Sequence, residues 1–179
     1  MTDDRSAKVL IVDDETALLD SYAALLETRY TVETAATGGE ALATVDAETD
    51  VVLLDRRLPE YSGEEVLSGI RDQGHDPQVL FCSAVVPEPE IVPMEPDGYL
   101  HKPVGVDELF DALETQLELV DLPPEVREYR TLERLRESIE SAGVGTGAET
   151  DPQYRQLLER IETAQSAVDG AGENQQSTV

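Results

Sequence analysis

The chain has 179 residues and a formal net charge of −26, from 39 acidic and 13 basic residues, and 40% of its residues are hydrophobic. That hydrophobic content follows a regular α/β periodicity, which excludes an acidic disordered protein. A single cysteine excludes an intramolecular disulfide framework, and no apolar stretch approaches the ~20 residues that a membrane-spanning helix needs.

The charge also predicts the environment of the protein. Repulsion among so many carboxylates destabilises a compact fold, and molar salt, with a screening length of ~3 Å, largely removes that repulsion. Only two of the 13 basic residues are lysines, and large aromatic residues are few. The amino terminus lacks a signal-peptide pattern. This composition is typical of a cytoplasmic protein from a salt-accumulating halophile, and we expect an archaeal source.

Short apolar runs alternate with helix-like stretches over the first 121 residues. The runs are continuous rather than alternating, which is typical of buried parallel strands. We expect strands over 8–12, 30–36, 51–54, 78–82 and 98–101, and helices over 15–29, 38–48, 62–73 and 106–120. Strands that alternate with helices predict an α/β fold with a doubly wound, five-stranded parallel sheet.

Polar residues follow four of the predicted strands. Asp13 and Asp14 follow the first strand, Asp55 the third, Ser83 the fourth and Lys102 the fifth. In a doubly wound sheet, ligands bind at the carboxyl ends of the strands, so we expect these side chains to converge on one pocket. Crowded carboxylates repel one another, and a divalent cation with a preference for oxygen ligands, such as Mg²⁺, relieves the repulsion. An ionised aspartate can also form an aspartyl-phosphate.

Each of these residues has a structural interpretation as well. Asp13 could cap the following helix, Asp55 could begin a turn, and Ser83 could be a structural hydroxyl. Lys102 could be a surface residue, but it is one of only two lysines beside eleven arginines. A chain that has largely replaced lysine yet keeps one before Pro103 has reason to need an ammonium group there.

With these landmarks in this order, residues 7–121 resemble the receiver domain of two-component response regulators, which has a flavodoxin-like fold. Leu58-Pro59, Ser62-Gly63 and Lys102-Pro103 also match the family's motifs. The resemblance implies that the residue at position 55 accepts a phosphoryl group from a sensor histidine kinase. It further implies that the acidic pair at 13 and 14 holds Mg²⁺, and that the residues at 83 and 102 assist the transfer.

The same resemblance implies roles for two more residues. Tyr99, three residues before Lys102, matches the aromatic residue that changes orientation in the switch, although a tyrosine in a strand could simply be packed there. Arg57, two residues after Asp55, would supply a backbone carbonyl to the metal. A receiver is a phosphoacceptor switch and not an enzyme, with at most self-phosphorylation and self-dephosphorylation.

The segment between the fourth and fifth strands departs from the receiver pattern. Residues 84–98 contain four prolines, and each proline inside a helix costs ~3 kcal/mol. We therefore expect a degenerate fourth helix of one or two turns, or an irregular segment. In receivers, the surface formed by the fourth helix, fifth strand and fifth helix often carries dimerisation and output. This departure puts that output surface in doubt.

Two amphipathic helices are predicted after the receiver, over 125–141 and from Pro152 onward, joined by a glycine-rich link at 142–148. Together they predict an α-helical hairpin. Residues 123–170 resemble the HalX domain that follows receivers in haloarchaeal proteins, and 171–179 are predicted to form a disordered tail. A two-helix unit cannot cover both of its apolar stripes alone. It is therefore expected to pack on the receiver, on a second copy or on a protein partner.

Two outputs are compatible with this organisation. The first is a signalling module in which phosphorylation changes how the hairpin engages a protein target or a second copy. We expect the hairpin to hold that contact, so that removing 123–179 leaves a folded monomeric receiver. The alternative is a DNA-binding transcriptional regulator. Residues 123–179 carry six arginines, no lysine and eleven acidic residues, without a basic stripe, which argues against DNA. Acidic surfaces of halophile proteins weaken that argument.

Overall fold

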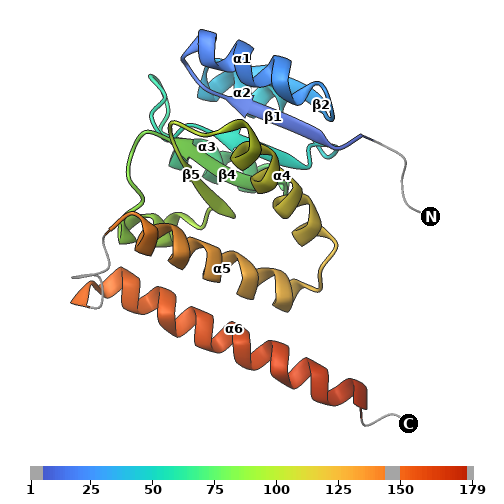
Figure 1. Cartoon of the computed structure of the whole chain (residues 1–179), viewed down its shortest axis with the longest axis vertical. Helices are drawn as coiled ribbons and strands as arrows, with labels where there is room; N and C mark the ends of the chain where they lie inside the picture. The colour runs from blue at the N-terminus through green and yellow to red at the C-terminus, as the bar shows by residue number, and fades with distance from the viewer. Residues whose placement is uncertain (1–5, 144–149, 177–179) are drawn as a thin grey trace.

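The computed structural model describes residues 6–143 and 150–176. Its five strands form one parallel sheet in the order β2-β1-β3-β4-β5, which confirms the predicted doubly wound fold (Figure 1). The connection from β1 leads to β2 at one edge of the sheet, whereas β3, β4 and β5 follow one another toward the other edge. The strand order therefore reverses beside β1. The strands are β1 (Lys8–Val12), β2 (Thr31–Ala35), β3 (Val51–Leu54), β4 (Gln78–Ser83) and β5 (Gly98–His101).

Two apolar layers cover the sheet. On one face, α1 (Thr16–Leu26) and α4 (Val106–Val120) pack against alternate residues of the strands. On the other face lie α2 (Gly38–Thr44) and α3 (Gly63–Asp72). The three inner strands, β1, β3 and β4, are buried along their whole length, and the edge strand β5 is buried except at its last residue, which explains why these sequences are continuously apolar.

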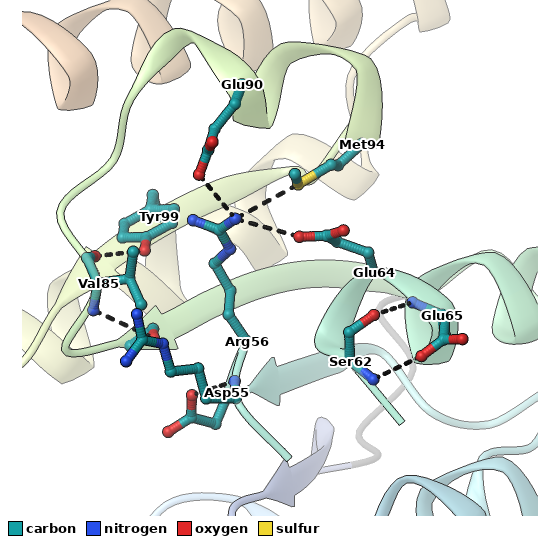
Figure 2. Close-up of polar contacts among 11 residues, drawn as sticks. Asp55, Arg56, Ser62, Glu64, Glu65, Val85, Glu90, Met94 and Tyr99 are labelled. Atoms are coloured by element: carbon teal, nitrogen blue, oxygen red, sulfur yellow. Dashed lines mark hydrogen bonds and ion pairs between the residues drawn. The ribbon is translucent and has the colours of Figure 1, made fainter. Parts of the chain in front are cut away.

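Local signals set the ends of α3. Ser62 and Glu65 form a reciprocal capping box, in which the hydroxyl of Ser62 accepts from the Glu65 amide at 3.2 Å and the Glu65 carboxylate accepts from the Ser62 amide at 2.8 Å (Figure 2). After the helix, Gly74 adopts a φ of 80°, a left-handed conformation that glycine tolerates. Both ends lie within one residue of the prediction.

The fourth helix is degenerate, as the prolines predicted. In its place is a 3₁₀ helix of six residues, η1 (Pro89–Met94), which includes Pro93. The residue that follows, Glu95, has a φ of 54° and ends the segment in the left-handed region. Because a non-glycine residue is disfavoured there, surrounding contacts must hold this turn in place.

The C-terminal hairpin packs on its own receiver. Its helices are α5 (Pro124–Ser141) and α6 (Pro152–Gln176); α5 lies between the α/β unit and α6, alongside β5, and α6 contacts η1 (Figure 1). The apolar residues of both helices belong to the same buried cluster as β3, β4, α3 and η1; on the hairpin these are Leu132, Leu135, Ile139, Tyr154, Leu157, Ile161 and Ala164. This packing favours the intramolecular alternative for the hairpin over a second copy or a partner.

The prediction of a disordered tail from residue 171 is wrong for its first six residues, because α6 continues to Gln176. Extending an existing helix is much easier than nucleating one, and Ala, Glu and Gln in this stretch have high helix propensity, which offsets its one glycine. Residues 177–179, and 144–148 of the predicted link, lie outside the described residues. Among the described helices, none combines the length and apolarity that crossing a membrane requires.

Candidate functional site

The predicted polar residues converge at the carboxyl ends of the strands. The ammonium Nζ of Lys102 lies 2.5 Å from Oδ2 of Asp13 and 2.5 Å from Oδ2 of Asp55. Both aspartates are buried, with 3% and 8% of their surface exposed. The three residues follow β1, β3 and β5, and thus connect positions up to 89 residues apart in the sequence.

Three carboxylates gather beside this ammonium. One oxygen from each of Asp13, Asp14 and Asp55 lies within 4.8 Å of the others, and Asp14 is exposed while its two neighbours are buried. A set of oxygen donors from a few carboxylates with one side open to water is the environment in which proteins hold Mg²⁺. The donor set therefore fits the predicted metal, with the exposed side available for water and phosphate oxygens.

Backbone amides orient the two buried carboxylates. The amide of Glu15 donates to Oδ1 of Asp13 at 3.0 Å, and the amide of Arg57 donates to Oδ1 of Asp55 at 2.8 Å. The amide of Asp55 itself donates to the carbonyl of Val12 at 2.9 Å, which ties its backbone to the end of β1. The side chain of Arg57 is exposed. Its backbone carbonyl stays a predicted metal ligand.

The electrostatics of Lys102 reflect two opposed influences. Burial lowers its pKa, but the hydrogen bonds and charges of Asp13 and Asp55 outweigh burial and raise the pKa above the ordinary value of 10.5. The side chain therefore carries a full positive charge at neutral pH. This charge neutralises part of the carboxylate cluster and is available to a phosphoryl group.

Ser83 lies at the end of β4, next to the strand that carries Asp55, and is buried. Its hydroxyl accepts from the amide of Val85 at 3.3 Å, and its carbonyl accepts from the amide of Lys102 at 2.9 Å. The second contact joins the ends of β4 and β5. Ser83 thus lies at the predicted edge of the pocket, with its backbone tied to the lysine that reaches Asp55.

Tyr99 points inward and is buried against Phe81, edge to face, with ring centroids 6.2 Å apart. Its hydroxyl donates to the carbonyl of Val85 at 2.5 Å (Figure 2). Burial raises the pKa of Tyr99, and the nearby guanidinium of Arg56 opposes that rise. The loop residue Val85 therefore binds both predicted switch residues, through its amide to Ser83 and through its carbonyl to Tyr99.

Sequence reasoning missed Arg56, which directly follows Asp55. Its guanidinium is almost completely buried, and Nη2 lies 3.1 Å from Glu64, 3.3 Å from Glu90 and 3.9 Å from the sulfur of Met94 (Figure 2). Nothing in the sequence separates this arginine from Arg57 beside it, whose side chain is exposed. The only available signal was its position next to the acidic residue at the strand end.

Comparison with known proteins agrees with this geometry. A family model for the response regulator receiver domain matches residues 9–114. Over 170 residues the chain is 38% identical to a protein of Haloferax volcanii that is named as a candidate transcriptional regulator; the match covers 94% of this chain and 29% of that protein. The transcriptional regulatory protein KdpE of Mycobacterium tuberculosis is 36% identical over 109 residues, or 59% of this chain and 48% of KdpE. The chain thus spans less than half the length of these relatives.

Solved structures show the same α/β unit. A CheY-like receiver domain from Methanospirillum hungatei superposes with a TM-score of 0.58 at 31% identity, covering 63% of this chain and 94% of that one. The chemotaxis protein CheY4 of Vibrio cholerae gives 0.59 at 32% identity, covering 63% and 99%. With a family model that matches more than half of its length, a sheet in the same order and an acidic cluster at the strand ends, the chain belongs to the response regulator receiver domain family.

Proposed function

We propose that the chain is a two-component response regulator in which Asp55 accepts a phosphoryl group from a sensor histidine kinase. The observation that carries this proposal is the cluster of Asp13, Asp14 and Asp55 around the ammonium of Lys102. A buried carboxylate held between a backbone amide and an ammonium is a positioned nucleophile. The chain acts as a switch, and no enzymatic output is proposed for it.

In this proposal a carboxylate oxygen of Asp55 attacks the phosphorus of the donor, and the bond from phosphorus to the donor's leaving group breaks. Asp13, Asp14 and Asp55 would hold Mg²⁺, which when bound neutralises charge on the phosphoryl oxygens. Lys102 already contacts Asp55 Oδ2 at 2.5 Å, so its ammonium can pass to a phosphoryl oxygen with little movement. Ser83, at the end of the next strand, would donate its hydroxyl to another phosphoryl oxygen.

The test is phosphorylation of the intact chain with Mg²⁺ and acetyl phosphate in molar KCl. The intact mass should rise by one phosphate in the natural chain and in Asp20→Asn, an exposed aspartate outside the cluster. The intact mass should not rise in Asp55→Asn, because asparagine has nearly the same size but lacks the negatively charged carboxylate oxygen that would act as the nucleophile. Labelling that persists in Asp55→Asn would assign the phosphoryl group to another residue.

The C-terminal helices are the proposed output element. Their assignment to the HalX domain stays a prediction, because the family model ends at residue 114. The similarity to the Haloferax protein covers 94% of this chain, however, and so includes most of the two helices. The organism of that relative supports the halophilic archaeal origin that we propose from the charge of −26, and a cytoplasmic setting is part of the same proposal.

The alternative output is direct DNA binding. It is favoured by the names of the relatives, two of which are described as transcriptional regulators. Against it stand eleven acidic residues and six arginines in 123–179. Electrophoretic mobility shift with genomic fragments in molar KCl separates the two outputs. A sequence-specific shift that requires phosphorylation would favour the DNA alternative over a protein partner.

A further inference from the structure

The segment between β4 and β5 is held from two sides by arginines. On the receiver side, Arg56 contacts Glu90 of η1 at 3.3 Å and the sulfur of Met94 at 3.9 Å. On the hairpin side, Arg160 of α6 pairs with Glu95 at 2.8 Å. The position of η1 therefore depends on one cation that follows the phosphoacceptor and on another that belongs to the output helices.

Apolar packing strengthens the contact between η1 and α6. Ile91 and Val92 of η1 are buried in the cluster that also contains Leu157 and Ile161 of α6. A displacement of η1 would therefore disturb the surface on which α6 rests. The left-handed backbone of Glu95, at a φ of 54°, shows that the end of η1 is held by these contacts and not by its own conformational preference.

Arg56 is only partly satisfied in this state. Its Nε and Nη1 are buried, and within the part of the chain that the structure describes neither has a hydrogen-bond partner. The guanidinium carbon lies 6.0 Å from the centroid of the Phe81 ring, which is a weak cation–π distance. A buried guanidinium with unused N–H donors is costly, so a stronger anionic acceptor nearby would compete for it.

We infer that Arg56 is a positioning residue that couples the phosphorylation of Asp55 to the seating of the C-terminal hairpin. In this state the Arg56 guanidinium is directed toward η1 and away from the Asp55 carboxylate (Figure 2). A phosphoryl group adds about −1.5 to −2 charges to Asp55, the residue that directly precedes Arg56 in the sequence. Arg56 then moves toward the new anion and releases Glu90. As a result η1 becomes more mobile, and α6 loses part of the surface against which it packs. The inference rests on the function proposed above. It adds that Arg56 transmits the effect of phosphorylation, and that this effect weakens the contact of the hairpin with the receiver.

Hydrogen–deuterium exchange on the full chain in molar KCl tests this coupling. The quantity measured is the ratio of amide exchange rates, with and without acetyl phosphate and Mg²⁺, in η1 and in the part of α6 that contacts it. In the natural chain the ratio should be at least about fivefold, the lower end of typical allosteric couplings. In Arg56→Met the ratio should fall to about one, while the mass increase by one phosphate is retained.

Two further variants keep the test decisive. Arg29→Met is a matched control, because Arg29 also pairs with a glutamate, Glu114 at 2.8 Å, and lies over an aromatic ring, that of Phe110 at 4.4 Å, on the other face of the sheet. It should keep the full ratio. Glu90→Gln removes the negative charge that Arg56 pairs with on η1, at a half-exposed position, so it serves if Arg56→Met does not fold, and it should lower the ratio.

The outcomes separate the inference from the proposed function. A chain that takes up one phosphate without any change of exchange in η1 and α6, or with slower exchange there, overturns the inference and leaves the phosphoacceptor role intact. An Arg56→Met variant that keeps the full ratio removes Arg56 from the coupling. Failure of the natural chain to take up phosphate in the mass measurement overturns the proposed function and the inference together.

Discussion

Two regions of this molecule are built on opposite principles. The carboxyl ends of β1, β3 and β5 carry a compact set of charges, Asp13, Asp55 and Lys102, fixed by short ion pairs and backbone amides. The face formed by β4, β5 and η1 is largely apolar and is covered by helices α5 and α6, with Arg56 buried beside η1 and Arg160 at its margin. The first region carries the groups of the proposed phosphorylation site, and the second buries a large share of the apolar side chains. Substitutions in the first region should therefore act mainly on phosphorylation and metal binding, and substitutions in the second mainly on stability.

Truncation before residue 123 should produce the largest effect. Each large apolar side chain that is buried contributes ~1.5–3 kcal/mol, and the hairpin both buries several and covers part of the receiver's core. The loss is comparable with the whole stability of a typical domain, ~5–15 kcal/mol. We expect residues 1–122 to show no cooperative thermal transition by circular dichroism in molar KCl. A truncated chain with the midpoint of the full one would show that the hairpin is an independent appendage.

A single substitution sharpens the same point. Leu135→Ala removes a buried side chain at the centre of the hairpin's contact and should cost ~2–5 kcal/mol in the free energy of unfolding. Val120→Ala, at a position 39% exposed, is the control and should cost well under 1 kcal/mol, as exposed sites usually do (~0.5). Both values come from urea unfolding. Mass spectrometry should still detect one phosphate on folded Leu135→Ala.

Salt acts on both regions, because the charge of −26 is spread over the whole chain. Transfer from molar KCl to dilute buffer lengthens the screening distance from ~3 Å to ~10 Å or more. The thermal midpoint should therefore fall by at least ~5 °C, which corresponds to about 1–2.5 kcal/mol for a chain of this size. A midpoint that is constant across this range would contradict the halophile interpretation.

The metal prediction addresses the charged region alone. Asp14 is exposed and lies within the carboxylate cluster, so Asp14→Ala should weaken Mg²⁺ binding about tenfold or more, or ~1.4 kcal/mol, without a change in thermal midpoint. Isothermal titration calorimetry in KCl gives the affinity. Asp20→Ala, an exposed residue outside the cluster, should bind Mg²⁺ as the natural chain does. Equal affinities in both variants would make the acidic pair structural only.

The smallest effect concerns pH. The pKa of Lys102 is raised above 10.5 in the folded chain, so its ion pairs stabilise the fold fully below that value and are lost as the pH rises through the higher folded pKa. Lys102→Arg keeps the charge and does not titrate in this range. From about pH 9 to about pH 12, stability should decline less in Lys102→Arg than in the natural chain. Parallel curves would show that Lys102 makes no pH-dependent contribution. Other groups whose raised pKa values have causes apart from Lys102 titrate in both proteins and cancel in the difference: Lys8, Tyr30 and Tyr99.

The charged region could be predicted from the sequence because its information is local. An apolar run that ends in a polar residue gives both the strand and the position of the side chain at its carboxyl end, as for Asp55 and Lys102. The degenerate fourth helix was also predictable, since a proline such as Pro93 removes a backbone donor wherever the chain folds.

The apolar region could not be predicted to the same depth. The spacing of Leu132, Leu135 and Ile139 shows that one side of α5 is buried, but any apolar surface of suitable shape could cover it. In the structure α5 lies against β5 of the same chain, and this choice of surface depends on how all the elements pack together. Arg56 was missed for a related reason: a strand end determines where a residue lies, whereas the direction of its side chain depends on neighbours far away in the sequence.

The seating of α5 beside β5 has a consequence for recombination between genes. Output modules are exchanged freely when each folds alone, but here the short η1 leaves a hydrophobic surface that α5 and α6 must cover. If this hairpin were grafted onto a receiver with a full fourth helix, that helix would occupy the surface on which the hairpin packs. This receiver, fused to a foreign output domain, would expose its interior. We expect productive chimeras only from crossovers upstream of Pro87, so that η1, β5 and α4 are inherited together with the hairpin.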